Sequence, residues 1–157
     1  RRAAEIRDIR GDLFNGRKAF PLTGCDKSWL PGLAGMEKAP RHAGVFIAEG
    51  CTDLLSGFDS YTRFKTQGGA NSWIVSGLLG ASCKPLAPEA EAIIRGRRVR
   101  LCPDGDDAGD RMGEHWERLL LKLGCDVDVL TVPRGSDLSD MWSRTADRAT
   151  LAQTLFS

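Results

Sequence analysis

Short apolar runs alternate with amphipathic stretches along most of this chain, and this alternation predicts strands and helices in turn. The clearest run is 44–50, where four consecutive apolar residues predict a strand that is buried on both faces, as in a parallel sheet. Further strands are expected at 72–79, 99–102 and 126–132. Apolar residues alternate in the last of these, which is typical of a strand near a sheet edge.

Helical patterns follow the strands. A helical turn is expected at 51–57, a helix at 88–94, a long amphipathic helix that ends at Gly124, and a closing helix at 145–156, whereas the polar stretch 59–65 fits no clear pattern. The apolar stripe of the long helix indicates core packing and comprises Met112, Trp116, Leu119, Leu120 and Leu123. Four strand–helix units predict a doubly wound α/β fold, with a mostly parallel sheet of about four strands and helices on both faces.

The first 43 residues have a different composition. Basic side chains outnumber acidic ones, and Gly and Pro recur, which favours short strands and turns over a long helix. We therefore expect a small irregular basic segment, 1–43, that packs on an α/β domain, 44–157, through the stretch 29–33. Its basic residues form either a solvated face or a surface that holds polyphosphate or a nucleic-acid backbone.

Composition sets the remaining limits. With 157 residues, 41% of them hydrophobic, the chain is long enough for one domain with its own core. It has no transmembrane span and no signal peptide, so we expect a cytoplasmic protein, and the absence of an initial Met suggests a piece of a longer chain. The five cysteines lack C-x-x-C spacing, which argues against a zinc site or a disulfide framework. No dinucleotide-binding or P-loop motif is present.

Carboxylates follow three of the predicted strands. Glu49 ends the first strand, Asp104 and Asp106 follow the third, and Asp137 and Asp140 follow the fourth. Because right-handed crossovers bring the carboxyl ends of parallel strands to one edge of the sheet, we expect Glu49, Asp104, Asp106 and Asp137 to converge there. Oxygen ligands of this kind suit Mg²⁺ or Mn²⁺ rather than zinc.

Each acid also has a purely structural interpretation. Asp104 and Asp106 suit the start of the long helix, because Asp is favoured at N-cap and first-turn positions. Asp53 either reaches the same cleft as Glu49 or is only a first-turn acid of its own helix. Glu49 itself could be an exposed loop acid. The presence of three acidic stretches at three strand ends favours the metal site.

Three segments resemble the Toprim domain, which is shared by topoisomerases, bacterial and phage primases, and some nucleases. Residues 45–50 together with Asp53 look like the hydrophobic strand of the family that ends in Glu-Gly. Residues 104–109 look like its D-x-D segment in the D-G-D-x-A-G form typical of primases, and residues 133–140 look like the P-x-G-x-D-x-x-D loop of primases. The resemblance covers about residues 43–142.

This chain departs from the primase pattern at two positions, Arg100 within the second acidic strand and Ser136 where primases often carry Lys, but both leave the acids in place. The resemblance implies Mg²⁺- or Mn²⁺-dependent nucleotidyl transfer by the catalytic core of a DNA primase, which makes short RNA primers from NTPs on single-stranded DNA in phage or plasmid replication. Asp104 and Asp106 would be the main metal ligands. The further ligand candidates are Asp137, Asp140, Asp53 and Glu49, the last as ligand or general acid/base.

Candidates for triphosphate or template contacts are Arg17, Lys18, Lys65 and Arg134. A replicative helicase, or a helicase domain of the same chain, is a further candidate partner at the replication fork, and no membrane is expected. Two alternatives stay open: a Toprim-type nuclease or topoisomerase-like domain, and a non-catalytic nucleic-acid-binding module attached to a helicase. Strand cleavage by topoisomerases needs a tyrosine, and Tyr61 is the only one in this chain.

Overall fold

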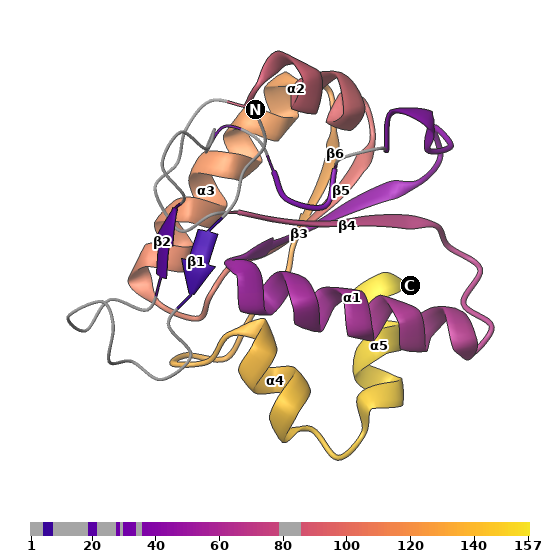
Figure 1. Cartoon of the computed structure of the whole chain (residues 1–157), viewed down its shortest axis with the longest axis vertical. Helices are drawn as coiled ribbons and strands as arrows, with labels where there is room; N and C mark the ends of the chain where they lie inside the picture. Colours follow the sequence, from indigo (N-terminus) through magenta and orange to yellow (C-terminus); the bar gives the residue numbers. More distant parts are fainter. Residues whose placement is uncertain (1–4, 8–18, 22–27, 29, 34–35, 79–85) are drawn as a thin grey trace.

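The structure is a computed structural model in which a parallel sheet lies between two layers of helices (Figure 1). It describes residues 5–7, 19–21, 28, 30–33, 36–78 and 86–157. The four strands of the sheet lie in the order β4 (Trp73–Leu78), β3 (Gly44–Glu49), β5 (Arg98–Cys102) and β6 (Asp126–Val129), and every neighbouring pair is parallel. The predicted α/β class and the four parallel strands are confirmed.

Helices cover both faces of this sheet (Figure 1). One face carries α2 (Pro88–Ile94) and α3 (Asp107–Lys122). The other face carries α1 (Cys51–Thr66), α4 (Leu138–Arg144) and α5 (Arg148–Phe156). Because each crossover helix returns the chain to the starting edge of the sheet, all four strands end at the same edge.

The central strand β3 explains the two-sided core. Its side chains alternate between faces, so Val45 and Ile47 join the cluster beneath α2 and α3, whereas Phe46 and Ala48 join the cluster beneath α1, α4 and α5. All four are essentially inaccessible to solvent. Burial on both faces requires a continuous apolar run, and this is why the strand was readable from sequence.

The amino-terminal part is described only in pieces. A short antiparallel pair joins β1 (Glu5–Arg7) to β2 (Ala19–Pro21), and a single 3-10 turn, η1, spans Met36–Lys38. Within the expected docking stretch 29–33, Leu30 and Leu33 are buried in the main core, and Trp29 lies outside the described residues.

Three elements differ from the sequence prediction. The predicted turn 51–57 is the start of a helix that continues to Thr66, because the polar stretch 59–65 also places Ser60 and Phe64 in the interior. The predicted strand 126–132 ends at Val129, since the neighbouring strand reaches Pro103, which has no N–H to extend the ladder.

The third difference concerns the carboxyl-terminal region. The last residues of the predicted acidic loop form the start of α4, and the closing helix, predicted at 145–156, begins only at Arg148. Trp142 anchors α4 because its indole Nε1 donates to Asp59 Oδ2 of α1 at 2.7 Å. The carboxyl end of α5 is also tied to the sheet, through a 2.8 Å hydrogen bond from Trp73 Nε1 to the Phe156 carbonyl.

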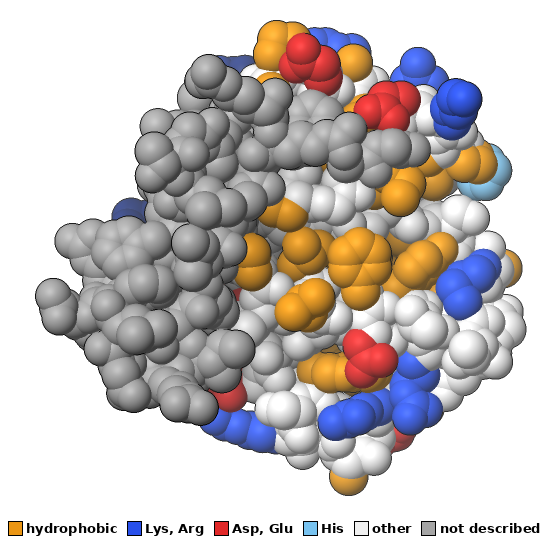
Figure 2. All heavy atoms as spheres, in the orientation of Figure 1, with side chains coloured by type: hydrophobic (Ala, Val, Ile, Leu, Met, Phe, Trp, Pro, Cys, Tyr) orange, Lys and Arg blue, Asp and Glu red, His pale blue; other side chains and the backbone are white. Residues whose placement is uncertain are grey.

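Hydrophobic side chains are exposed on one face of the molecule (Figure 2). On the face drawn in Figure 2, hydrophobic side chains form a band across the middle, with acidic and basic side chains distributed around it. The large hydrophobic residues that α1 exposes are Leu55 and Phe58.

No helix in the described part of the chain is long and apolar enough to span a membrane. Among the described cysteines, Cys102 and Cys125 are buried free thiols. Cys25 and Cys83 lie outside the described residues.

Candidate active site

Acidic side chains gather where the sheet ends. Glu49, the last residue of β3, is 6% exposed, and its Oε2 accepts a hydrogen bond of 3.2 Å from the backbone N–H of Asp104. Asp53, in the first turn of α1, is also buried, and its Oδ1 accepts a 2.9 Å hydrogen bond from the N–H of Ser139. These two carboxylates therefore connect β3 to the loop after β5, and α1 to the start of α4.

The loops after β5 and β6 are bonded to each other through their backbones. The N–H of Gly105 donates to the Ser136 carbonyl, and the N–H of Gly135 donates to the Gly105 carbonyl, both at 2.8 Å. A Cβ at position 105 would overlap the carbonyl of Pro133, so only glycine allows this approach. The two acidic segments are therefore held as one unit, although about 30 residues separate them.

Two of the acids cap the helices that follow them. One oxygen of Asp106, Oδ1, accepts from the N–H groups of Ala108 and Gly109, both at 2.8 Å, at the start of α3. Asp137 Oδ1 accepts from the N–H of Asp140 at 2.6 Å, at the start of α4. The capping interpretation therefore holds for Asp106 but not for Asp104, and Asp137 is a cap that the sequence analysis did not propose. Capping does not exclude metal binding, because each cap uses one carboxylate oxygen and leaves the other without a hydrogen bond from a described residue.

Asp104 carries the strongest electrostatic perturbation among these acids. Burial, together with repulsion from Glu49, Asp53, Asp137 and Asp106, raises the pKa of its carboxyl group to about 7. Burial also raises the pKa of Glu49, against the opposing effect of the N–H of Asp104. No hydrogen bond from a described residue reaches the Asp104 carboxylate, so its oxygens are available to a ligand.

The chemistry of the donor set fits a hard divalent cation. No three Cys, His, Asp or Glu side chains in the described ranges already have the spacing of a finished metal site. Mg²⁺ keeps several waters and takes only one or two protein carboxylates alongside substrate phosphates, so it does not need a complete protein cage. A cation beside Asp104 would also relieve the repulsion that raises the pKa of this residue.

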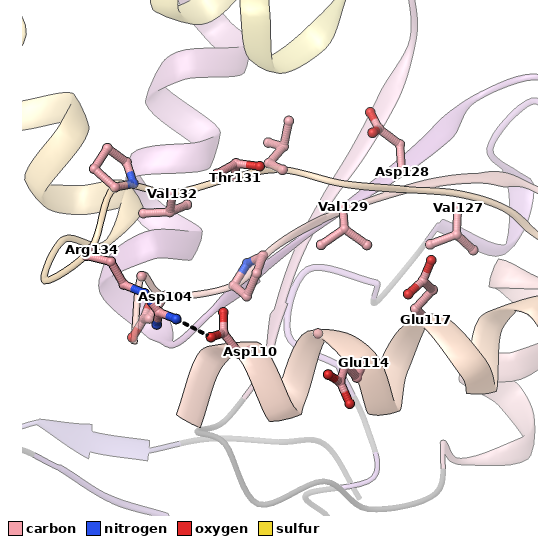
Figure 3. Close-up of a pocket in the computed structure, with 15 residues that line it drawn as sticks. Asp104, Asp110, Glu114, Glu117, Val127, Asp128, Val129, Thr131, Val132 and Arg134 are labelled. Atoms are coloured by element: carbon pink, nitrogen blue, oxygen red, sulfur yellow. Dashed lines mark hydrogen bonds and ion pairs between the residues drawn. The ribbon is translucent and has the colours of Figure 1, made fainter. Parts of the chain in front are cut away.

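The remaining candidate residues lie in different places. Asp140 stands in the first turn of α4 and pairs with Arg144 at 2.9 Å. Arg134 is exposed on the loop after β6 and pairs with Asp110 of α3 at 2.6 Å (Figure 3). Lys65 lies in the last turn of α1, which runs back from the acids by about 20 Å, and donates to the Gly69 carbonyl. The structure does not bring Lys65 to the site, and Arg17 and Lys18 lie outside the described residues.

Tyr61 is not placed for chemistry at the acidic edge. Its hydroxyl oxygen accepts a 3.1 Å hydrogen bond from the backbone N–H of Trp73. Trp73 is the first residue of β4, so this contact lies at the end of the sheet where the strands begin, away from the acids. The ring of Tyr61 packs against Phe156 with ring centroids 5.2 Å apart. Tyr61 is therefore a packing residue.

Sequence reasoning missed the backbone groups that hold the site. The carbonyl of Ser136 and the N–H of Ser139 fix the acidic loops, and a backbone group of this kind leaves no signal in the residue types. Cys102 was also not expected at the site. It is buried below the acids, where burial and the surrounding carboxylates raise the pKa of its thiol, so it remains protonated.

Comparison with known proteins identifies the family. A protein-family model described as Toprim-like matches residues 46–142, which is more than half of the chain and includes Glu49, Asp104 and Asp137. Comparisons with curated proteins and with solved structures gave no match. Toprim domains generally bind Mg²⁺, and they give primases, nucleases and topoisomerases a metal-dependent function on nucleic acid. With its parallel sheet and its acids at the carboxyl edge, the chain belongs to the Toprim-like family.

Proposed function

We propose that this chain is the catalytic core of a DNA primase, which transfers nucleotides from NTPs to make short RNA primers on single-stranded DNA. The observation that carries this proposal is the bonding of two acidic loops. The segment 104–109, with its primase-like D-G-D-x-A-G form, is hydrogen-bonded through Gly105 to the loop 133–140, which resembles the late acidic loop of primases. A nucleotidyl transferase needs such a cluster to bind the metal that accompanies the triphosphate.

Each acid has a proposed role. Asp104 and Asp106 would hold Mg²⁺ or Mn²⁺, with Asp137 as a further ligand, direct or through water. When bound, the metal neutralises the triphosphate and stabilises the attacking and leaving oxygens. Glu49 is a ligand or a general acid/base, and the upward direction of its pKa supports the second role, because a group that titrates nearer neutral pH exchanges protons more readily.

Asp53 and Asp140 are the remaining acids of the proposed metal site. Asp140 would be a further ligand, like Asp137, direct or through water. Asp53 supports the start of α4, because one of its carboxylate oxygens accepts a hydrogen bond from the backbone N–H of Ser139.

Arg134 is the basic residue best placed to bind a triphosphate, because its ion pairs are exposed and cost little to exchange. Lys65, in the last turn of α1, is too far from the acids for this role and is instead a candidate contact for nucleic acid elsewhere on the surface.

The template requires a surface separate from the acids, because carboxylates repel phosphates. We propose that the amino-terminal basic residues supply it, with Arg7, Arg10, Arg17 and Lys18 as candidates. Binding should be sequence-tolerant, and it should weaken with salt by roughly 0.7 log unit per log unit of salt for each phosphate neutralised. A helicase, as a separate protein or in the same chain, would present the single strand at the replication fork.

The direct test is synthesis. The protein is incubated with NTPs, Mg²⁺ or Mn²⁺, and single-stranded DNA, and the products are separated on a denaturing gel. Short RNA products that disappear in Asp104→Asn and persist in Asp107→Asn support the proposal. Asp107 is a matched control, because it is an exposed acid next to Asp106, at the first position of α3, and its one ion pair with a described residue is to Arg134 at 3.5 Å. Shortened DNA would instead identify a nuclease, and DNA binding without either product would identify a non-catalytic module.

A further inference from the structure

A groove runs along the outer edge of β6, next to the acidic site. Its volume is about 820 Å³, and it is lined by α3 on one side and by residues 127–134 on the other (Figure 3). Val127 and Val129 point toward α3, whereas Asp128 points to the other side of the strand (Figure 3). Because the lining includes side chains from both faces of β6, the groove follows the edge of the strand.

The backbone of β6 is open toward this groove. The N–H of Asp126 donates to the carbonyl of Arg97, the residue before β5, at 3.1 Å, and the N–H of Leu130 donates to the Leu101 carbonyl of β5 at 2.8 Å. Alternation along the strand then directs the N–H and C=O groups of Val127 and Val129 away from β5. Within the described ranges no group bonds to them from the outer side.

The outer strand on the opposite side of the sheet, β4, has its free edge covered. The N–H of Gly77 in β4 donates to the Pro31 carbonyl at 3.2 Å, and the hydroxyl of Ser76 donates to the same oxygen at 2.6 Å. Pro31, from the amino-terminal part of the chain, therefore covers the edge of β4, whereas no described residue of that part bonds to β6. An open edge is a template for another strand, so its surroundings decide what can pair with it.

The groove is strongly acidic. Its only basic lining residue, Arg134, already pairs with acids of α3. The acidic lining residues are Asp104, Asp110, Glu114, Glu117 and Asp128. This charge repels nucleic acid and favours a positively charged segment.

The inner neighbour of β6 shows which sequence pairs with it. In the β5–β6 register Arg98 faces Asp126, and Arg100 faces Asp128, with a 2.7 Å ion pair between Nε and Oδ2 in the second pair. Apolar residues face each other between these charged positions. The Asp-Val-Asp-Val sequence of β6 thus matches a strand in which basic and apolar residues alternate, as in the Arg-Val-Arg-Leu of β5. A second copy of β6 would oppose Asp to Asp, which is unfavourable.

We propose that the open edge of β6 binds an extended, basic segment of a partner protein, which adds to the sheet as a further strand. Basic residues would alternate with apolar ones, and the main chain would pair with Val127 and Val129. In the register seen for β5, the basic side chains would lie beside Asp126 and Asp128, and the apolar ones would lie on the face of Val127 and Val129. This surface does not depend on the reaction proposed above. Because Asp104 lines both the groove and the acidic site, the bound segment would lie directly beside the candidate active site.

The probe is a blocked synthetic peptide that repeats the Arg-Val-Arg-Leu sequence of β5, followed by amide NMR of the whole chain. The expected result is weak, salt-sensitive binding, with shifts and slowed hydrogen exchange at the Val127 and Val129 amides. Two control peptides carry Glu in place of each Arg, or N-methyl groups on the amides of one edge. Neither should bind, since the first reverses the charge and the second removes the main-chain donors.

Variants of β6 and α2 provide the matched comparison. The double change Asp126→Lys and Asp128→Lys should weaken peptide binding about tenfold, because it reverses the two charges of β6 that would face the basic side chains. Glu89→Lys on α2 reverses the charge of an exposed residue outside the groove and should leave binding unchanged. Folding of each variant is checked by circular dichroism, and the methylated peptide tests the proposal on the unaltered protein.

Several results would overturn the proposal. The peptide could fail to bind or could shift amides away from β6, or its methylated form could bind equally well. Glu89→Lys could weaken binding as much as the β6 variant. Concentration-dependent protection of Val127 and Val129 without peptide would show that a second copy pairs with the edge, and displacement of the peptide by single-stranded DNA at the same amides would show a nucleic-acid surface.

Discussion

Replacing Asp104 by Asn should stabilise the metal-free protein at neutral pH. The carboxyl group of Asp104 is partly buried among four other acids, and the pKa of about 7 is above its ordinary value of 3.8. An acid whose pKa is higher in the folded state contributes stability at low pH, and this contribution is lost as pH rises through the folded pKa. Asn keeps the shape of the side chain and removes the charge that the fold disfavours.

The size of the effect follows from the two pKa values. The difference between 3.8 and about 7 corresponds to at most about 4 kcal/mol, at 1.36 kcal/mol for each pKa unit. Asp104 is partly exposed, and solvent screening reduces this ceiling to about 1–2 kcal/mol. For a chain of 157 residues, this corresponds to an increase of roughly 3–6 °C in the melting temperature.

The assay is thermal unfolding in the presence of a chelator, followed by circular dichroism between about pH 4 and pH 8. The difference in melting temperature between wild type and Asp104→Asn should be smallest near pH 4, close to the unfolded-state pKa of 3.8, and the variant should gain steadily toward pH 8. Asp107→Asn, which removes a neighbouring exposed charge, should show no such trend. A variant that melts below wild type at pH 8, or a difference that is independent of pH, would refute the reasoning.

Substitutions at three other positions give distinct expectations. Asp106→Ala should lower the free energy of unfolding by about 1 kcal/mol, because it removes the cap of α3, whereas Asp106→Asn retains a capping oxygen and should melt close to wild type. Gly109→Ala should destabilise the protein by about 1–3 kcal/mol in urea titrations, because its Cβ would overlap the Asp104 carbonyl and displace the acidic loop. Arg134→Ala should change the same free energy by about 1 kcal/mol or less, since both of its ion pairs are exposed.

The sequence predicted an element correctly wherever its residue pattern was compatible with only one local structure. The apolar run of β3 could only be a strand buried on both faces, and Pro88 and Gly96 bracketed α2 closely. The convergence of Glu49 with Asp104 followed from parallel topology, because strands of one sheet that share a direction end at one edge.

Other features depended on tertiary contacts. The second half of α1 looked irregular because most of its residues face solvent, and its helical conformation depends on Ser60 and Phe64 packing inward. The placement of Lys65 depended on the same error, since a helix through Thr66 carries it away from the acids. The double role of Asp106, as a cap and as a candidate ligand, required coordinates, because both roles favour the same residue type at the same position.

Metal binding by the acids at the end of the sheet is the central claim, and a titration with Mn²⁺ tests it most directly. Electron paramagnetic resonance or calorimetry would compare the wild-type chain with the double variant Asp104→Ala/Asp106→Ala and with Asp107→Asn. Wild type and Asp107→Asn should bind Mn²⁺ weakly and alike, and Mg²⁺ should compete for the same site, whereas the double variant should lose this binding. Unchanged binding in a folded double variant would show that the metal sits elsewhere and would contradict the account.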